Sequence, residues 1–252
     1  MILRRLSQNL RTQNWTAITI EFVLVVLGVF FGILAANWNL ERVEKQATGQ
    51  LLSQLDTELA EVLVDLESMD AYYAVAGGYA TRALAGWRGD PRVSDSEFVI
   101  AAYQASQING VGTNSSVWAD IFGADNLRNI KDLALRRTLR QLMTFDYSLV
   151  DLAAAMSRYR EEVRKVIPDG QQRAIRARCG DIQTPKGILV LPAICDLQLP
   201  ASEASQTAAA LRARPDLIRE LNWHQAKIAT QLQNIDGLRT YAVELSKKID
   251  GP

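Results

Sequence analysis

One long apolar run dominates the pattern of hydrophobic and polar positions along the chain. Residues 17–36 contain a single charged side chain, Glu21. As an α-helix rising ~1.5 Å per residue, these twenty residues span about 30 Å, the thickness of a bilayer hydrocarbon core. Trp15 and Trp38 flank the run, at positions where indole rings prefer the interface between lipid and water. The pattern predicts a transmembrane helix over residues 17–38.

A cleaved export signal is the main alternative for this segment. Export signals have a shorter apolar region and end in a small-x-small cleavage site. Here sixteen residues precede the run, and cleavage after Ala35 or Ala36 would place Ile33 or Leu34 where a small residue is needed. These features favour a helix that is retained in the membrane.

The charges on either side of the run predict its orientation. Three basic residues and no acidic residue precede it: Arg4, Arg5 and Arg11. The charges of residues 41–45, directly after the predicted helix, cancel. The positive-inside rule therefore makes residues 1–16 a short cytoplasmic tail and puts residues 39–252 on the outer side. In a bacterium, this is an inner-membrane protein with a periplasmic domain.

Small residues and one carboxylate share a face of the predicted membrane helix. Gly28, Gly32 and Ala36 recur every four residues, a spacing that lets a second membrane helix approach closely. Glu21 lies seven residues before Gly28 and so near the same face. It either extends to water at the cytoplasmic interface or faces a partner helix. We predict packing through this face, with ordinary membrane-helix composition as the alternative.

Beyond the run, apolar positions alternate by three and four, as in helices that pack on other helices. The first series continues from the membrane helix: Leu52, Leu55, Leu59, Val62, Leu66, Met69 and Tyr73. The second repeats every seven residues after Pro215: Leu221, Ile228, Ile235, Ala242 and Ile249. We call these two series the heptad seams. They predict two long amphipathic helices, of which the first meets its first weak point at Gly77 and Gly78.

Shorter helical segments lie between the two seams. Ser94 and Glu97 have the spacing of a capping box ahead of a short helix that ends near residue 107. Apolar periodicity over residues 126–167 predicts one long helix, which Pro168 stops.

The remaining segments complete an all-α prediction. A short helix is expected from Ser202 to Pro215. The stretch "ILVLP" over residues 188–192 resembles a strand but has no evident partner strand. We therefore expect a transmembrane helix that continues into an extracytoplasmic bundle of about four main helices.

The two cysteines lie in a segment rich in Pro and Gly. Fifteen residues separate Cys179 from Cys195. A disulfide that closes a loop of this size stabilises a fold by about 3 kcal/mol in the chain-entropy estimate, and an oxidising compartment permits it. We expect a disulfide loop near residues 168–200. The alternative is two unrelated buried thiols, whereas a zinc site would lack half of its ligands.

Composition narrows the range of functions. The formal net charge is zero, and residues 41–252 carry 25 basic and 27 acidic groups, a balance without the basic excess of a nucleic-acid-binding protein. One histidine gives a metal site little to build on. The sequence contains no Gly-rich phosphate loop, HExxH or GxSxG motif. We expect no enzymatic activity, no cofactor and no metal.

Four groups of chemistry-bearing residues each have a structural and a functional interpretation. They are His224, the pair Glu161–Glu162 beside Arg160 and Arg164, the basic pair Arg136–Arg137, and the aromatic set Tyr72, Tyr73, Tyr79 and Trp87. We predict a packed histidine, a solvated helix face in the second and third cases, and core aromatics. A catalytic base, an anion site and a ligand pocket are the respective alternatives.

Two segments resemble a family of uncharacterised bacterial single-pass membrane proteins. The first combines a basic leader, "QNW", an apolar span with an acidic residue at its start, and "NWN". The second, "GADNLRNIKDLALRRTLRQL" (Gly123 to Leu142), is similar to a Gly-x-Leu-x-x-Ile…Leu-Arg-x-x-Leu segment, although Gly123 precedes Leu127 by four residues. Together they cover about a quarter of the chain. The resemblance implies the single-pass topology and an extracytoplasmic helical domain, and it implies no activity.

These observations favour a structural or interaction protein of the cell envelope. We expect its partners to be the lipid bilayer and either a second copy or an envelope protein, bound through the membrane helix and the heptad seams. One alternative is a sensor-like module that binds a small molecule between its helices. Another is an energy-coupling subunit in which Glu21 carries protons.

Overall fold

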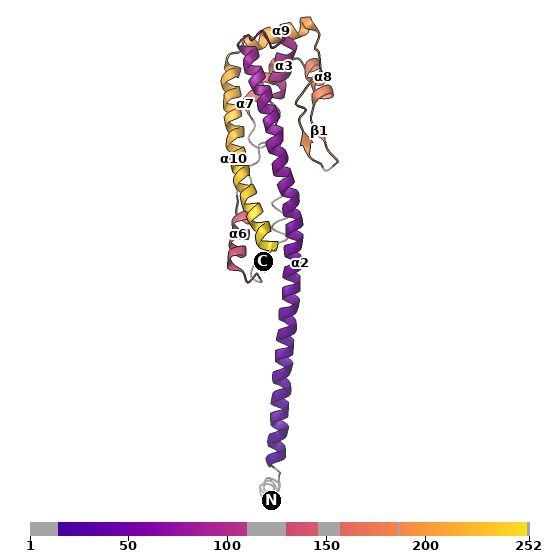
Figure 1. Ribbon diagram of the computed structural model, residues 1–252, viewed down its shortest axis with the longest axis vertical. Coiled ribbons are helices and arrows are strands. Elements are labelled where there is room, and N and C mark those ends of the chain that lie inside the picture. Colours follow the sequence, from indigo (N-terminus) through magenta and orange to yellow (C-terminus); the bar gives the residue numbers. More distant parts are fainter. Residues whose placement is uncertain (1–14, 110–129, 146–156, 186, 251–252) are drawn as a thin grey trace, which may run out of the picture. The chain divides into compact units, whose positions relative to one another are not determined.

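The computed structural model describes residues 15–109, 130–145, 157–185 and 187–250 (Figure 1). These ranges contain seven helices and one two-stranded sheet, which confirms the predicted all-α class. The elements are α2 (Trp15–Trp87), α3 (Asp95–Gln104), α6 (Leu133–Met143), α7 (Arg158–Val166), α8 (Asp169–Cys179), β1 (Ile182–Gln183), β2 (Leu189–Val190), α9 (Ala201–Arg212) and α10 (Asp216–Asp250). The chain divides into two compact units, Met1–Leu52 and Ser53–Pro252.

The first unit contains the apolar part of α2. Every described side chain from residue 19 to residue 47 is exposed, including the large apolar ones. The part of the chain that the structure describes has one helix long and apolar enough to cross a membrane, and it is this one. Because the helix is apolar around its whole circumference here, its composition matches a hydrocarbon environment rather than one buried stripe.

The second unit is built around the predicted heptad seams. In the first seam Leu55, Leu59 and Leu66 are fully buried, whereas Val62 is half-buried. The second seam is buried at Leu221, Ile228, Ile235 and Ala242 and half-buried at Ile249, and Leu238 and Leu245, which lie between its positions, are buried too. The periodicity therefore identified the core faces of both long helices. Gly77 and Gly78 do not interrupt α2, which continues to Trp87.

Two polar contacts join the long helices α2 and α10, which lie alongside each other within the second unit (Figure 1). Arg239 Nη1 donates to Asp70 Oδ2 over 3.0 Å, and Ser246 Oγ donates to Asp56 Oδ1 over 2.7 Å. Exposed or half-buried pairs of this kind contribute little to stability but help to set the register of the two helices. The buried seams supply most of the packing energy.

Short helices pack on one another and at both ends of α10: α7 lies near its N-terminal part and α6 near its C-terminal end (Figure 1). Helix α3 packs on α9 and α7, while α10 packs on α6 and α7. The predicted capping box at the start of α3 is confirmed, since Glu97 N donates to Ser94 Oγ and Ser94 N donates to the Glu97 carboxylate. Helix α3 ends at Gln104, three residues before the predicted end.

The single long helix predicted over residues 126–167 is wrong. Helix α6 ends at Met143, because Thr144 and Phe145 leave the helical conformation. A separate helix, α7, begins at Arg158 and ends at Val166, just before the predicted stop. Periodicity alone does not distinguish one helix from two helices whose apolar faces lie in phase.

The segment after Pro168 also differs from the prediction. Instead of a loop, a new helix α8 begins at Asp169, and Pro168 is its N-cap residue, a position where no hydrogen bond within the helix needs the N–H that proline lacks. The strand-like stretch does find a partner: β2 pairs antiparallel with β1, and Ile182 lies opposite Val190. The prediction of an unpartnered strand is therefore wrong.

Gly86 and Gly78, both on α2, provide a matched pair of substitutions. A Cβ at Gly86 would overlap the Phe98 side chain, whereas a Cβ at Gly78 meets nothing within 4 Å. We expect Gly86→Ala to lower the free energy of unfolding by about 1–3 kcal/mol, through overpacking. Gly78→Ala is expected to raise it by up to about 1 kcal/mol, because alanine is the better helix former. Urea denaturation followed by circular dichroism measures both, and equal effects would contradict this packing.

Candidate functional site

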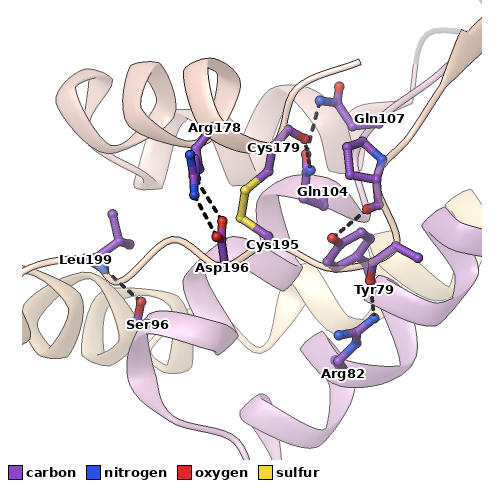
Figure 2. Close-up of a disulfide and its surroundings, with 12 residues drawn as sticks. Tyr79, Arg82, Ser96, Gln104, Gln107, Arg178, Cys179, Cys195, Asp196 and Leu199 are labelled. Atoms are coloured by element: carbon purple, nitrogen blue, oxygen red, sulfur yellow. Dashed lines mark hydrogen bonds and ion pairs between the residues drawn. A yellow bond between two sulfur atoms is a disulfide. The ribbon is translucent and has the colours of Figure 1, made fainter. Parts of the chain in front are cut away.

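A disulfide near the β-hairpin is the chemical feature that stands out in the second unit. Cys179, the last residue of α8, and Cys195 lie at disulfide distance, with their Cα atoms 5.4 Å apart (Figure 2). Cys179 is buried and Cys195 is half-buried. The structure thus agrees with the predicted pairing of these two residues rather than with two unrelated thiols.

The extended chain after β2 is held by side chains from α2 and α3 (Figure 2). Tyr79 Oη donates to Pro192 O over 2.8 Å, and Arg82 Nη2 donates to Ala193 O over 3.2 Å. Ser96 Oγ accepts from Leu199 N over 3.0 Å. These contacts satisfy backbone groups that have no helix or sheet partner. Together with the disulfide, they fix the loop to the helical core.

Two linked hydrogen bonds of glutamine side chains connect the end of α3 to the backbone of the disulfide. Gln104, which is fully buried, donates from Nε2 to Cys179 O, and Gln107 Nε2 donates to Gln104 Oε1 over 3.2 Å (Figure 2). The backbone carbonyl of Cys179 is therefore part of a buried polar network. On the exposed side of the loop, Arg178 Nη2 and Asp196 Oδ2 form an ion pair of 2.6 Å.

The predicted aromatic core is confirmed for Tyr72, Tyr73 and Tyr79, which are buried, whereas Trp87 is half-buried. Tyr73 Oη donates to Asn109 O over 2.6 Å and accepts from Asn109 N over 2.8 Å. Trp87 Nε1 donates to Leu211 O, and Tyr72 Oη donates to Asp181 Oδ1, over 2.9 Å in each case. Burial raises the pKa of Tyr72, so this hydroxyl stays protonated. Tyr73 and Tyr72 thus join α2 to the segments after α3 and α8, and Trp87 joins it to α9.

His224 lies on the buried face of α10 and is packed there, as predicted. Its ring is 2% exposed and stacks on Tyr159, with ring centroids 5.8 Å apart. Its Nε2 atom has no hydrogen-bond partner among the described residues. Burial is the main cause that lowers the pKa of His224 to about 4; a hydrogen bond with the Ala105 backbone opposes it, and the nearby charges of Arg160 and Lys227 add to it. The ring is therefore neutral at pH 7.

This histidine predicts how stability depends on pH. Its pKa is lowered on folding, so the unfolded chain binds a proton first as the pH falls below about 6.5. We expect the free energy of unfolding to fall by about 2 kcal/mol between pH 7.5 and pH 5 because of this group. His224→Gln should flatten that part of the curve. Urea denaturation at a series of pH values tests this, and an unchanged pH dependence in the variant would contradict it.

The predicted membrane residues lie on the exposed part of α2. Glu21, Ala36 and Trp38 are exposed, and a Cβ at Gly28 or Gly32 would have nothing within 4 Å. Trp15, the other predicted interface residue, is the first residue of α2. The face formed by Gly28, Gly32 and Ala36 is therefore open along its length, as a helix contact would need.

The two charged segments predicted to be solvated, around Arg136 in α6 and around Glu161 in α7, differ in their surroundings. Arg137 and Arg140 of α6 are exposed and Arg136 is half-buried, which fits the predicted solvated face. In α7 the solvated-face prediction holds for Glu161 only. Arg160 and Arg164 are half-buried against residues 106 and 107, because they flank the buried positions Tyr159 and Val163 on one side of the helix. In the sequence, the spacing of four residues between the two arginines, each next to Tyr159 or Val163, was the feature that could have predicted their half-burial.

No protein-family model, curated protein or solved structure matches this chain. Within the described ranges, no group of three or more His, Cys, Asp or Glu side chains is arranged to hold a metal ion. The segment Gly123 to Leu142 of the family resemblance lies partly outside the described residues. The resemblance thus remains a prediction, and the functional argument depends on the geometry of the chain itself.

Proposed function

We propose that this chain is a single-pass inner-membrane protein whose periplasmic helical domain serves as a structural or interaction component of the cell envelope. The observation that carries the proposal is the apolar run of α2, exposed on all sides over a length that matches a bilayer. Lipid would cover this surface in the cell. The proposed role is binding and assembly rather than catalysis.

Two features support the periplasmic side for the second unit. Arg4, Arg5 and Arg11 precede the run without an acidic residue, which favours a cytoplasmic N-terminus. The cysteine pair at disulfide distance favours an oxidising compartment. The two arguments are independent, since one depends on charge and the other on redox chemistry.

The membrane helix is the proposed contact surface for a partner. The heptad seams pack within the second unit, for example at Leu59 and Leu221, and so are occupied by the chain's own core. The open face of Gly28, Gly32 and Ala36 has no such occupant among the described residues. Lipid tails are as apolar as the side chains, so the hydrophobic effect does not drive membrane helices together. Their association depends instead on close packing, which small residues permit.

Bulky substitutions on this face test the proposed association. We expect Gly28→Ile with Gly32→Ile to remove the oligomer or envelope complex, because the added side chains keep a partner helix at a distance. Gly49→Ile is the matched control, since Gly49 is also an α2 glycine with open surroundings but lies beyond the predicted span. Crosslinking in membranes followed by native mass spectrometry in detergent measures the assembly. Complexes that are unchanged in the double variant would refute this contact.

A further inference from the structure

Three arginines from two neighbouring helices share their contacts near the end of α3. Arg160 and Arg164 lie one turn apart on α7, and both donate to Gln107 Oε1, over 3.3 Å and 2.9 Å. Arg164 also lies over the Tyr103 ring, 4.7 Å from its centroid, and Arg176 Nη1 of α8 donates to the hydroxyl of the same tyrosine over 3.2 Å. These shared partners place three guanidinium groups side by side. We call them the arginine cluster.

Arg160 and Arg164 differ from four other arginines of the domain in what they bind. Arg178, Arg212, Arg214 and Arg239 each form an ion pair of 3.1 Å or less with a carboxylate. Among the described residues, Arg160 and Arg164 have no carboxylate within 4.0 Å, and their hydrogen-bond acceptors are the neutral atoms Ser106 O, Ser106 Oγ and Gln107 Oε1. Their charges are therefore held in position without being neutralised.

Acidic residues near the cluster do not balance its charge. Asp181 acts on Arg160 at a distance but is exposed and accepts a hydrogen bond from Tyr72. Asp169 lies 4.0 Å from Arg176 and is paired more closely with Arg173, at 2.6 Å. Within the part of the chain that the structure describes, three positive charges thus face the weak influence of two exposed carboxylates that already have other partners.

Partial burial makes this arrangement unfavourable without a ligand. Loss of solvent lowers the pKa of both Arg160 and Arg164, and repulsion from Arg160 and Arg176 lowers that of Arg164 further. A half-buried charge that is not compensated destabilises a fold, and an opposite charge at hydrogen-bond distance removes that cost. An anion that enters the cluster would therefore be stabilised by all three guanidinium groups.

We propose that the arginine cluster is a binding site for a small oxyanion, a carboxylate or a phosphate. The described hydrogen bonds of Arg160 use Nη1, and those of Arg164 use Nε and Nη2. Their remaining N–H groups have no acceptor among the described residues, and a planar guanidinium matches carboxylate and phosphate oxygens in pairs. Contacts with Gln107, Ser106 and Tyr103 orient the forks in advance, which lowers the entropic cost of binding. This site is independent of the proposed membrane contact.

The first test uses the full chain in nanodiscs of zwitterionic lipid, so that no anionic headgroup competes. Thermal unfolding is followed while inorganic phosphate or succinate is added, with sodium chloride at matched ionic strength as reference. At a concentration about tenfold above the dissociation constant, the specific anion should raise Tm by about 3–5 °C over chloride. The anion with the larger effect identifies the ligand class. If neither exceeds chloride at 10 mM, the proposal is refuted.

Variants then locate the site. Arg160→Gln with Arg164→Gln should abolish the specific increase in Tm, whereas Arg178→Gln, which alters an exposed arginine paired with Asp196, should keep it. Arg164→Lys retains the charge but not the fork, so it should weaken binding at least tenfold. If the double variant does not fold, broadening of the phosphorus resonance of inorganic phosphate by the wild-type chain, reversed by sulfate, decides the question. An increase that persists in the folded double variant would overturn the assignment.

Discussion

Val25→Arg combined with Val29→Arg is expected to release the protein from the membrane or to stop its insertion. These valines lie near the middle of the predicted span and on one face of α2, and both are exposed. Each arginine at the centre of a membrane helix costs about 2.5–3.5 kcal/mol on insertion scales. The double variant should therefore insert less favourably by roughly 5–7 kcal/mol. Carbonate extraction of membranes, followed by detection of the protein in pellet and supernatant, measures the outcome.

Val43→Arg is the matched control for this experiment. Val43 belongs to the same helix and is 54% exposed, close to the 61% of Val25, but it lies outside residues 17–38. The control should remain in the membrane pellet. If the double variant also stays in the pellet after carbonate extraction, the apolar run does not anchor the chain.

Removal of the disulfide is expected to have the second-largest effect. Cys179→Ser with Cys195→Ser opens a loop whose ends are 16 positions apart, and the chain-entropy estimate for such a loop is about 3 kcal/mol. In a domain of about 200 residues, this corresponds to a decrease in Tm of roughly 6–12 °C. The loop should stay attached at Tyr79 and Ser96, so the helical content should change little. Thermal unfolding followed by circular dichroism gives both quantities.

Reduction of the wild-type protein supplies an independent comparison. Dithiothreitol should lower the Tm of the wild type to that of the double serine variant and should leave the variant unchanged. A variant with the stability of the oxidised wild type would show that the cross-link contributes nothing. A wild type that does not respond to reductant and already has the lower Tm of the double serine variant would show that Cys179 and Cys195 are not bonded in the isolated protein.

Sequence periodicity identified the elements whose packing repeats over several turns. The positions Leu55, Leu59 and Leu66 and the series from Leu221 to Leu245 recur at helical spacing, and the structure buries them. The capping box at Ser94 was equally evident, because its mechanism involves only neighbouring residues. Capping between neighbouring residues and burial that repeats at helical spacing can therefore be predicted from the sequence.

Features that depend on contacts between distant segments could not be predicted from the sequence in the same way. The break after Met143 lies within an uninterrupted apolar pattern, and the pairing of β1 with β2 involves only two residues in each strand. The half-burial of Arg160 and Arg164 depends on residues 106 and 107, more than fifty positions earlier in the chain. Only their position beside Tyr159 and Val163 indicated that these arginines face inward.

Protease accessibility in spheroplasts tests most directly whether residues 17–38 hold the chain in the membrane with residues 39–252 outside. With an epitope at the C-terminus, protease added to intact spheroplasts should remove the epitope while a cytoplasmic marker survives. In inverted membrane vesicles the same epitope should be protected. An epitope that resists protease until the spheroplasts are lysed, or a mature chain that begins after Trp38, would contradict the proposed anchor and its orientation.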